Sequence, residues 1–376
     1  MTSSNKPAVL QVLPELRSGG VERGTVEIGQ ALVDDGHRSA VLSAGGPMVA
    51  QLDAQGTTHH TLPVHKKSLR TLTLVPAVRA LIQEFDVVHV RSRMPAWVTY
   101  LAWRKLPAHK RPTLVSTFHG LYSINRYSAV MARSQRIIAI SQCVKDYIQT
   151  NYGVEENLIR LIHRGVDPQE FPRDYQMSDA WQSAWYAENP ARQGRIFLTL
   201  PGRITRWKGA EAFLRLISTL ARRYNVHGLL VGDIAPGKQK YRHELERLAW
   251  QLGIEDRIEI TGARSDLKDI YALSAITFNL STHPEPFGRT MIEALSMGRP
   301  VVAWDYGGAA ESVGALFPDG VVPPHDEAQL AACCMRILNQ QHQPPATNTF
   351  LLETMRRETL QVYAEAFTSK GQSPAS

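Results

Sequence analysis

Short apolar segments rich in β-branched residues alternate with amphipathic segments along most of this 376-residue chain. Helical segments such as residues 21–34 and 71–84 separate several of these apolar runs. Strands that alternate with helices build a parallel sheet with both faces covered, so the pattern predicts a doubly wound α/β domain. In the first half of the chain, the predicted strands are residues 8–13, 39–43, 57–62, 86–90, 113–117, 136–140 and 158–162.

The alternation stops at residues 168–194 and then begins again. This segment is rich in Gln, Ser, Asp, Trp and Pro, and we expect a linker with a short helix around residues 181–186. Asp326 fits the N-cap of a helix at 327–338, and an amphipathic helix at 350–367 closes the chain. The second series predicts strands at 195–200, 226–231, 257–260, 275–280 and 300–303, with helices at 210–224, 239–252, 267–273 and 289–297.

Two such series predict two doubly wound domains that face a cleft, with ligands beyond the carboxyl ends of the strands. A hydrophobic content of 43% and a charged content of 20% are typical of a soluble globular protein. Residues 1–6 are polar, and no apolar run approaches the roughly 18 residues that a membrane helix needs. Because Cys143, Cys333 and Cys334 lack the spacing of a disulfide framework, we expect a cytoplasmic protein.

The net charge of +7 lies entirely in the first half of the chain. Residues 1–172 hold 20 Lys or Arg against 13 Asp or Glu, whereas the remainder holds 22 of each. Such a surplus suits anionic lipid, nucleic acid or an anionic acceptor, or it serves only solubility. The chain has no recognisable motif for reading nucleic acid, so we expect no nucleic-acid partner.

The stretch from Glu285 to Glu293 carries the strongest chemical signal. Glu285 precedes a Pro-Phe-Gly turn, and Glu293, eight positions later, lies in a predicted helix that begins after Gly288. Free N–H groups and the positive dipole end at the start of a helix hold phosphate. A sugar nucleotide would fit this stretch, because one acid can bind sugar hydroxyls, the helix start can bind phosphate, and a second acid lies in the helix. The alternative is that Glu285 and Glu293 are ordinary surface acids, but this would leave the agreement of the turn, the helix start and the spacing unexplained.

Two cations follow the first strand of the second series. Arg203 and Lys208 lie in Pro-Gly-Arg-Ile-Thr-Arg-Trp-Lys-Gly, at a strand-to-helix junction where they can neutralise a diphosphate. The segment does not match a P-loop, and a solvated basic turn is the alternative. No Asp-x-Asp pair occurs in the sequence, and no His, Cys or Asp cluster has metal-ligand spacing. We therefore expect a diphosphate to be neutralised without a metal ion or other cofactor.

Three further turns are weaker candidates. Gly19 and Gly20 follow the first strand, where they let the backbone approach a ligand or simply form a tight turn. Their segment is not G-x-G-x-x-G, which argues against a nicotinamide cofactor. His119 follows the strand at 113–117. It is either a site residue or a loop histidine that hydrogen-bonds to the backbone. Gly307 and Gly308 follow the strand at 300–303, as nucleotide contacts or as a plain turn.

Together these motifs resemble those of the family-4 retaining glycosyltransferases of GT-B fold. The resemblance covers nearly the whole chain, with the motifs in the expected order. It implies that Gly19 and Gly20 contact the phosphates or sugar of the donor, and that His119 lies against the donor sugar. It also implies that Arg203 and Lys208 bind the diphosphate.

The same resemblance assigns the Glu285–Glu293 stretch. Glu285 would meet sugar hydroxyls and Glu293 the ribose, while the N–H groups of Gly288, Arg289 and Thr290 would hold phosphate. The implied catalytic residues are His119, Arg203, Lys208 and Glu285.

The resemblance also implies the domain organisation. Residues 1–172 would form the acceptor-side domain and residues 173–349 the domain that binds the nucleotide sugar. A closing helix and tail, residues 350–376, would cross back onto the first domain.

Two departures from the family pattern add cations to the acceptor side. Arg164 replaces Asn in the Asn-Gly-Val-Asp of many members, and His89-Val-Arg91-Ser-Arg93 replaces His-x-His. We therefore assign Arg91, Arg93 and Arg164 to the acceptor side. The Arg-Ser-Arg variant is similar to bacterial enzymes of surface-polysaccharide and lipopolysaccharide core assembly. This predicts a glycan or glycolipid acceptor, anionic in character, and contact with the cytoplasmic face of the inner membrane.

The reaction implied is transfer of a sugar from a nucleoside diphosphate sugar to an acceptor hydroxyl, with retention of configuration. Two other functions fit part of the evidence. A nucleotide-sugar epimerase shares the GT-B architecture but needs no acceptor. An inactive scaffold would bind the nucleotide sugar without turnover.

Overall fold

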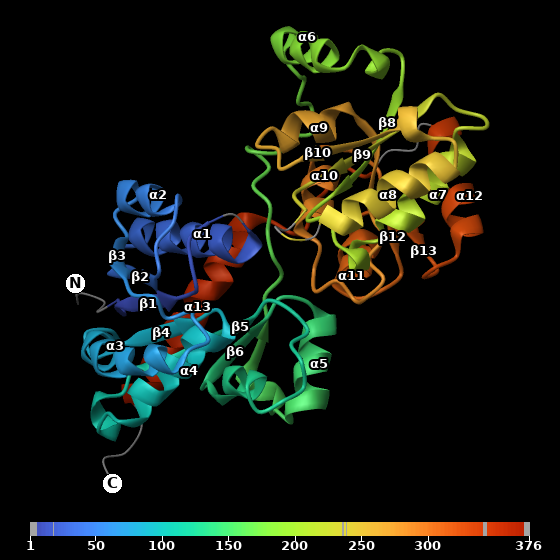
Figure 1. Ribbon diagram of the computed structural model, residues 1–376. Helices are drawn as coiled ribbons and strands as arrows, with labels where there is room; N and C mark the ends of the chain where they lie inside the picture. The colour runs from blue at the N-terminus through green and yellow to red at the C-terminus, as the bar shows by residue number, and fades with distance from the viewer. Residues whose placement is uncertain (1–5, 18, 235–236, 238, 341–343, 372–376) are drawn as a thin grey trace. The chain divides into compact units, whose positions relative to one another are not determined.

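The computed structural model describes residues 6–17, 19–234, 237, 239–340 and 344–371 (Figure 1). The chain divides into two compact units, of which the first joins Met1–His163 to Glu353–Ser376 and the second is Arg164–Leu352. Residues 1–5 and 372–376, the ends of the predicted first domain and of the predicted tail, lie outside the described residues. Among the described residues, no helix combines the length and apolar character needed to cross a bilayer.

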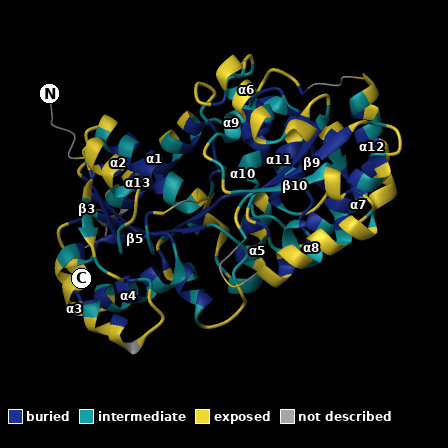
Figure 2. Cartoon of the chain, turned by 45° about the horizontal axis from the view of Figure 1, so that its top comes forward, coloured by how far each residue is buried: buried dark blue, intermediate teal, exposed yellow. Residues whose placement is uncertain are grey.

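The first unit contains a parallel sheet of seven strands among the described residues, in the order β3-β2-β1-β4-β5-β6-β7. Each strand lies within one or two residues of its predicted range, because runs of β-branched residues suit a sheet buried on both faces. Figure 2 shows β5 as a buried ribbon. The strands are β1 (Val9–Val12), β2 (Ser39–Ser43), β3 (Thr58–Thr61), β4 (Val87–Val90), β5 (Thr113–Phe118), β6 (Arg136–Ala139) and β7 (Ile159–Leu161).

The helices of the first unit differ from the predicted ones at residues 71–84. There a 3-10 helix, η1 (Leu69–Leu74), gives way to α3 (Val75–Ile82), because Pro76 fits the first turn of a new helix. Other helical segments are α1 (Gly20–Asp34), α2 (Val49–Ala54), α4 (Arg93–Arg104), η2 (Ala108–Lys110), η3 (Ser128–Arg133), α5 (Gln142–Tyr152) and η4 (Glu156–Leu158).

The last helix, α13 (Leu352–Gly371), packs within the first unit. The Tyr363 hydroxyl lies 2.6 Å from Nδ1 of His89 on β4. The Thr113 hydroxyl donates to the Ala366 carbonyl at 3.0 Å. These buried hydrogen bonds attach the end of the chain to the middle of the first sheet.

The second unit contains a parallel sheet of six strands among the described residues, in the order β10-β9-β8-β11-β12-β13. Its strands are β8 (Ile196–Pro201), β9 (Val226–Val231), β10 (Ile258–Gly262), β11 (Ser274–Asn279), β12 (Val301–Trp304) and β13 (Val321–Val322). Its helical segments are α6 (Asp179–Glu188), η5 (Pro190–Arg192), η6 (Arg206–Lys208), α7 (Ala210–Leu220), α8 (Gln239–Gln251), η7 (Glu255–Arg257), α9 (Leu267–Leu273), α10 (Arg289–Ser296), α11 (Gly308–Leu316), η8 (Pro318–Gly320) and α12 (Glu327–Gln340).

The segment expected as a linker contains the predicted short helix, α6. Trp185 of α6 is buried against Phe197, Leu229 and neighbouring side chains of the second sheet. Two parallel sheets flanked by helices confirm the predicted doubly wound α/β class.

Candidate active site

Two loops at the carboxyl ends of β8 and β11 meet through Lys208 and Glu285. The Lys208 ammonium forms an ion pair with the Glu285 carboxylate, and the side chains are 22% and 12% exposed. The Ser281 hydroxyl donates a hydrogen bond of 2.9 Å to the same carboxylate. The fold therefore brings together a cation and an acid that the sequence assigned to one ligand. Ser281 was not predicted.

Backbone contacts hold these two loops against each other. Gly209 has a φ of 81°, and a Cβ there would overlap the carbonyl oxygen of Leu280. The Thr282 N–H donates to the Trp207 carbonyl at 2.7 Å. Only glycine combines this left-handed conformation with so close an approach. The position of Lys208 beside Glu285 thus depends on the glycine that follows it.

A glycine turn supports Glu285 from the other side. The Gly308 N–H donates to the Glu285 carbonyl at 2.7 Å. Gly307 has a φ of 75°, and a Cβ on it would lie 2.8 Å from the Glu285 nitrogen. The turn predicted as a nucleotide contact therefore anchors the backbone of a predicted site residue.

The helix α10 begins after Gly288, as the sequence predicts. Gly288 occupies the N-cap with a φ of 80°, and no hydrogen bond from a side chain of the described residues caps this end. The first N–H groups of a helix lack partners within it, so those of Arg289 and Thr290 are suited to phosphate. The start of α10 is therefore confirmed, and its binding of phosphate stays a prediction.

Glu293 is held inside the second unit. Its side chain is buried, one carboxylate oxygen lies 3.2 Å from Nε of Arg289, and the other accepts from the Tyr271 hydroxyl at 3.2 Å. Tyr271 was not predicted, because it lies on α9, far from α10 in sequence. The role of Glu293 toward a ribose remains a prediction.

Three cations follow β8, and their surroundings differ. Arg203 is exposed. Arg206 pairs with Glu244 of α8, and its guanidinium lies 4.8 Å from the ring centre of Tyr241. Lys208 lies 4.3 Å from the ring centre of Trp207. Arg206 therefore contacts α8, whereas, among the described residues, no such contact with α8 involves the predicted Arg203 and Lys208.

The predicted residues of the first unit follow β1 and β5. Gly19 has a φ of 155°, and α1 begins at Gly20. Ser18, part of the same motif, lies outside the described residues. His119 follows β5 and is half-buried. Its N–H donates to the Tyr122 hydroxyl at 3.4 Å.

The three cations assigned to the acceptor side lie in different settings. Arg91 is 2% exposed. Burial lowers the pKa of its guanidinium, which a hydrogen bond with Tyr363 only partly offsets. Arg93 is half-buried, 4.9 Å from the ring centre of Tyr122. Arg164 is buried and belongs to the second unit. Arg93 is thus the most accessible of the three.

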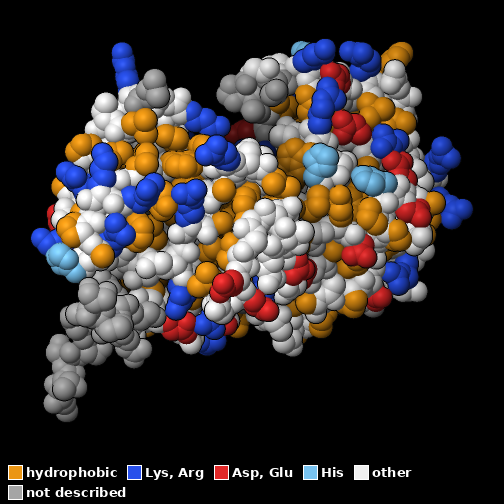
Figure 3. Space-filling view, turned by 90° about the horizontal axis from the view of Figure 1, so that it is seen from below, with side chains coloured by type: hydrophobic (Ala, Val, Ile, Leu, Met, Phe, Trp, Pro, Cys, Tyr) orange, Lys and Arg blue, Asp and Glu red, His pale blue; other side chains and the backbone are white. Residues whose placement is uncertain are grey.

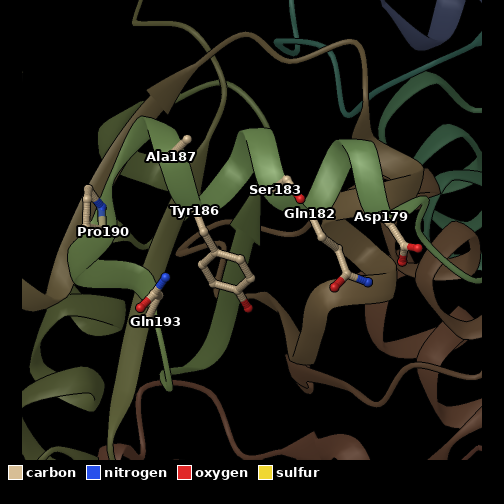
Figure 4. Close-up of a pocket in the computed structure, with 7 residues that line it drawn as sticks. All are labelled: Asp179, Gln182, Ser183, Tyr186, Ala187, Pro190 and Gln193. Carbon is tan, nitrogen blue, oxygen red and sulfur yellow. The ribbon is translucent and has the colours of Figure 1, made fainter.

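A surface pocket of about 630 Å³ lies apart from the predicted residues. Figure 4 shows that its lining comes from α6 and the turn that follows. The lining residues are Asp179, Gln182, Ser183, Tyr186, Ala187, Pro190 and Gln193. None of them is a predicted site residue, so this pocket does not coincide with the predicted donor site.

Both parts of the chain match known families. Residues 18–170 match Glycosyltransferase Family 4, and residues 182–349 match Glycosyl transferases group 1. An uncharacterized glycosyltransferase of Methanocaldococcus jannaschii is 23% identical over 320 residues, which are 78% of this chain and 79% of that protein.

Solved structures agree over almost the whole chain. A glycosyltransferase from Rickettsia africae has a TM-score of 0.83 and 30% identity, covering 96% of this chain and 99% of that one. HepE of Anabaena, in complex with UDP-glucose, has a TM-score of 0.79 and 24% identity, covering 96% and 100%.

The matching families and the two parallel sheets define a glycosyltransferase of GT-B fold. The chain belongs to the family-4 glycosyltransferases, as its motifs predict.

Proposed function

We propose that this enzyme transfers a sugar from a nucleoside diphosphate sugar to an acceptor hydroxyl, with retention of anomeric configuration. The observation that carries the proposal is the contact of Lys208, Glu285 and Ser281. In a nucleoside diphosphate sugar, the diphosphate is bonded to the sugar. Here Lys208, a cation suited to the diphosphate, contacts Glu285, an acid suited to the sugar hydroxyls. The complex of HepE with UDP-glucose supports a donor of this class.

The proposed roles follow the charge that develops during transfer. As the bond to the diphosphate breaks, negative charge grows on the leaving group. Lys208, Arg203 and the N–H groups at the start of α10 carry positive charge or partial charge, and they would stabilise the charge on the leaving group. Glu285 would accept hydrogen bonds from the sugar hydroxyls. Glu293 would hold the ribose.

We propose that the reaction needs no metal ion. The support is the donor set, because the sequence offers two cations and a helix N-terminus but no Asp-x-Asp pair. Turnover should therefore persist in excess EDTA, and loss of turnover that Mg²⁺ or Mn²⁺ restores would contradict this part of the proposal.

We propose an anionic glycan or glycolipid acceptor, in lipopolysaccharide core or surface-polysaccharide assembly at the cytoplasmic face of the inner membrane. Residues 87–145 contain ten Lys or Arg and no Asp or Glu. Figure 3 shows Lys and Arg side chains interspersed with hydrophobic ones on one face of the first unit. Binding of such a surface to a membrane that contains anionic lipid gains roughly 1 kcal/mol for each Lys or Arg close to the membrane. Sedimentation with vesicles, with and without anionic lipid, tests this attachment.

Product analysis tests the reaction itself. The enzyme is incubated with UDP-, GDP- or ADP-sugars, with and without lipopolysaccharide core acceptors. A transferase yields a glycosylated acceptor and a nucleoside diphosphate, and the anomeric coupling in the product reports retention. An isomerised nucleotide sugar formed without an acceptor would identify an epimerase. Binding without any product would identify a scaffold.

A further inference from the structure

The loop that follows β5, residues 119–127, is closed by a hydrogen bond near its start. The His119 N–H donates to the hydroxyl of Tyr122 at 3.4 Å. The side chain of Tyr122 therefore folds back on the backbone of His119. The sequence offers no signal for this contact, because a tyrosine three residues after a histidine has no fixed structural meaning.

Two tyrosines of α5 hold the same turn. The hydroxyls of Tyr147 and Tyr152 both donate to the Tyr122 carbonyl, the second at 3.3 Å. Tyr152 also lies within hydrogen-bond distance of the Ser123 carbonyl, at 3.2 Å. Two phenols from one helix thus converge on a single carbonyl of the loop. A loop fixed in this way loses much of the freedom that surface loops ordinarily have.

Aromatic packing fixes the rings that carry these hydroxyls. The Phe118 ring lies 5.3 Å from that of Tyr122 and 5.6 Å from that of Tyr152, measured between centroids. The Arg93 guanidinium lies 4.9 Å from the centre of the Tyr122 ring. Aromatic and cation–π contacts of this kind restrict the ring positions. The end of β5, the start of α4 and the end of α5 therefore share one cluster.

The hydroxyls remain hydrogen-bond donors at neutral pH. Burial raises the pKa of Tyr122, Tyr147 and Tyr152 above the ordinary value for tyrosine. The hydroxyls of Tyr147 and Tyr152 thus stay protonated throughout the neutral range, and their bonds to the loop carbonyls persist there.

We infer that Tyr122, Tyr147 and Tyr152 are positioning residues that fix His119 for sugar transfer. The inference rests on the proposed function and on the catalytic role that the family resemblance implies for His119. A displacement of about 1 Å in a reacting group can cost on the order of 10²-fold in rate. The three tyrosines would limit that displacement through their hydrogen bonds to the backbone of the loop.

The test removes the two donors of α5 in the full-length enzyme. In the Tyr147→Phe/Tyr152→Phe double variant, we expect kcat for sugar transfer to fall at least tenfold, while KM for the donor stays within about twofold. The matched control is Tyr175→Phe/Tyr224→Phe. It removes two phenol hydroxyls that donate to Asp269 and Asn339 in the second unit, and it should keep the wild-type kcat.

A double-mutant cycle with His119→Ala separates positioning from a general loss of structure. If the two tyrosines act through His119, their removal should leave kcat within about twofold when His119 is already alanine. Full additivity of the two effects overturns the inference, as does a double variant with wild-type kcat. If His119→Ala alone retains wild-type kcat, the proposed role of His119 fails, and the inference fails with it for that distinguishable reason.

Discussion

Replacing Glu285 by glutamine should change nucleotide binding and sugar transfer in opposite directions. Glu285 holds Lys208 in an ion pair, so Lys208 is available to a diphosphate only in competition with that carboxylate. Glutamine has nearly the same size but no charge. It therefore releases Lys208 and removes a negative charge next to the expected diphosphate position. We expect tighter binding of the nucleoside diphosphate and slower transfer of sugar.

The size of the two effects follows from the surroundings of the pair. Two charges about 4 Å apart near a protein surface attract by about 4 kcal/mol before solvation costs. Exposed pairs retain only about 0.2–1 kcal/mol after those costs, and this pair is mostly buried, so we take about 1 kcal/mol. That corresponds to about fivefold tighter binding. Losing hydrogen bonds to a charged acceptor costs about 1.5–3 kcal/mol, which lowers kcat roughly ten- to hundredfold.

Calorimetric titration with UDP, GDP and ADP measures the first effect, and transfer kinetics with the corresponding sugar measure the second. Glu327→Gln is the control, because it breaks the ion pair between Arg215 of α7 and Glu327 of α12, which includes no predicted site residue. That variant should change neither quantity. Weaker or unchanged binding of the preferred nucleotide to Glu285→Gln would refute the competition for Lys208. A kcat within twofold of wild type would refute the contact of Glu285 with the sugar.

Two predictions concern stability. Gly209→Ala should lower the free energy of unfolding by several kcal/mol, because its Cβ would overlap the Leu280 carbonyl. The control Gly253→Ala should lower it by only about 1–2 kcal/mol, because Gly253 has a φ of 66° but open space around its Cβ position. Equal losses for the two variants in urea titrations would contradict the clash at Gly209. Burial would raise the pKa of Glu259, but the His227 ring, 3.7 Å from its carboxylate, and hydrogen bonds from Arg192 lower it to about 2. Its stabilisation, up to about 3 kcal/mol, is thus present above pH 4.5 and lost as pH falls toward 2, so Glu259→Gln should flatten the acid unfolding curve between these values.

Local sequence patterns were sufficient for the first sheet and for five strands of the second, whereas the two-residue strand β13 was not predicted. Runs of β-branched residues identified the strands, and the sharp turn at Gly288 identified the start of α10. The helices α4 and α5 were not predicted, although α5 has clear signals. Ser141 caps its start, and Gly153 ends it in the left-handed conformation. Both residues can be recognised in the sequence and would have located α5. By contrast, no side chain among the described residues caps the start of α4.

The contacts of the site could not be predicted from sequence, because they depend on strand order. The strand β11 lies beside β8, although β9 and β10 come between them in the chain. Lys208 therefore meets Glu285, 77 positions away. The same limit applies to Arg91, which was assigned to the acceptor side but is buried against Tyr363 of the last helix. Sequence motifs indicate which role a residue can have, whereas the order of the strands decides which other residues it contacts.

We propose that Lys208 and Arg203, the two predicted cations after β8, hold the donor diphosphate during transfer. Thermal stabilisation by UDP-, GDP- and ADP-sugars first identifies the donor. The decisive measurement is kcat for transfer from that donor by Lys208→Ala and by Arg203→Ala. We predict a fall of about 10²-fold or more in each variant, the scale of losing one group that stabilises transition-state charge. Near-normal turnover in both variants would contradict the claim.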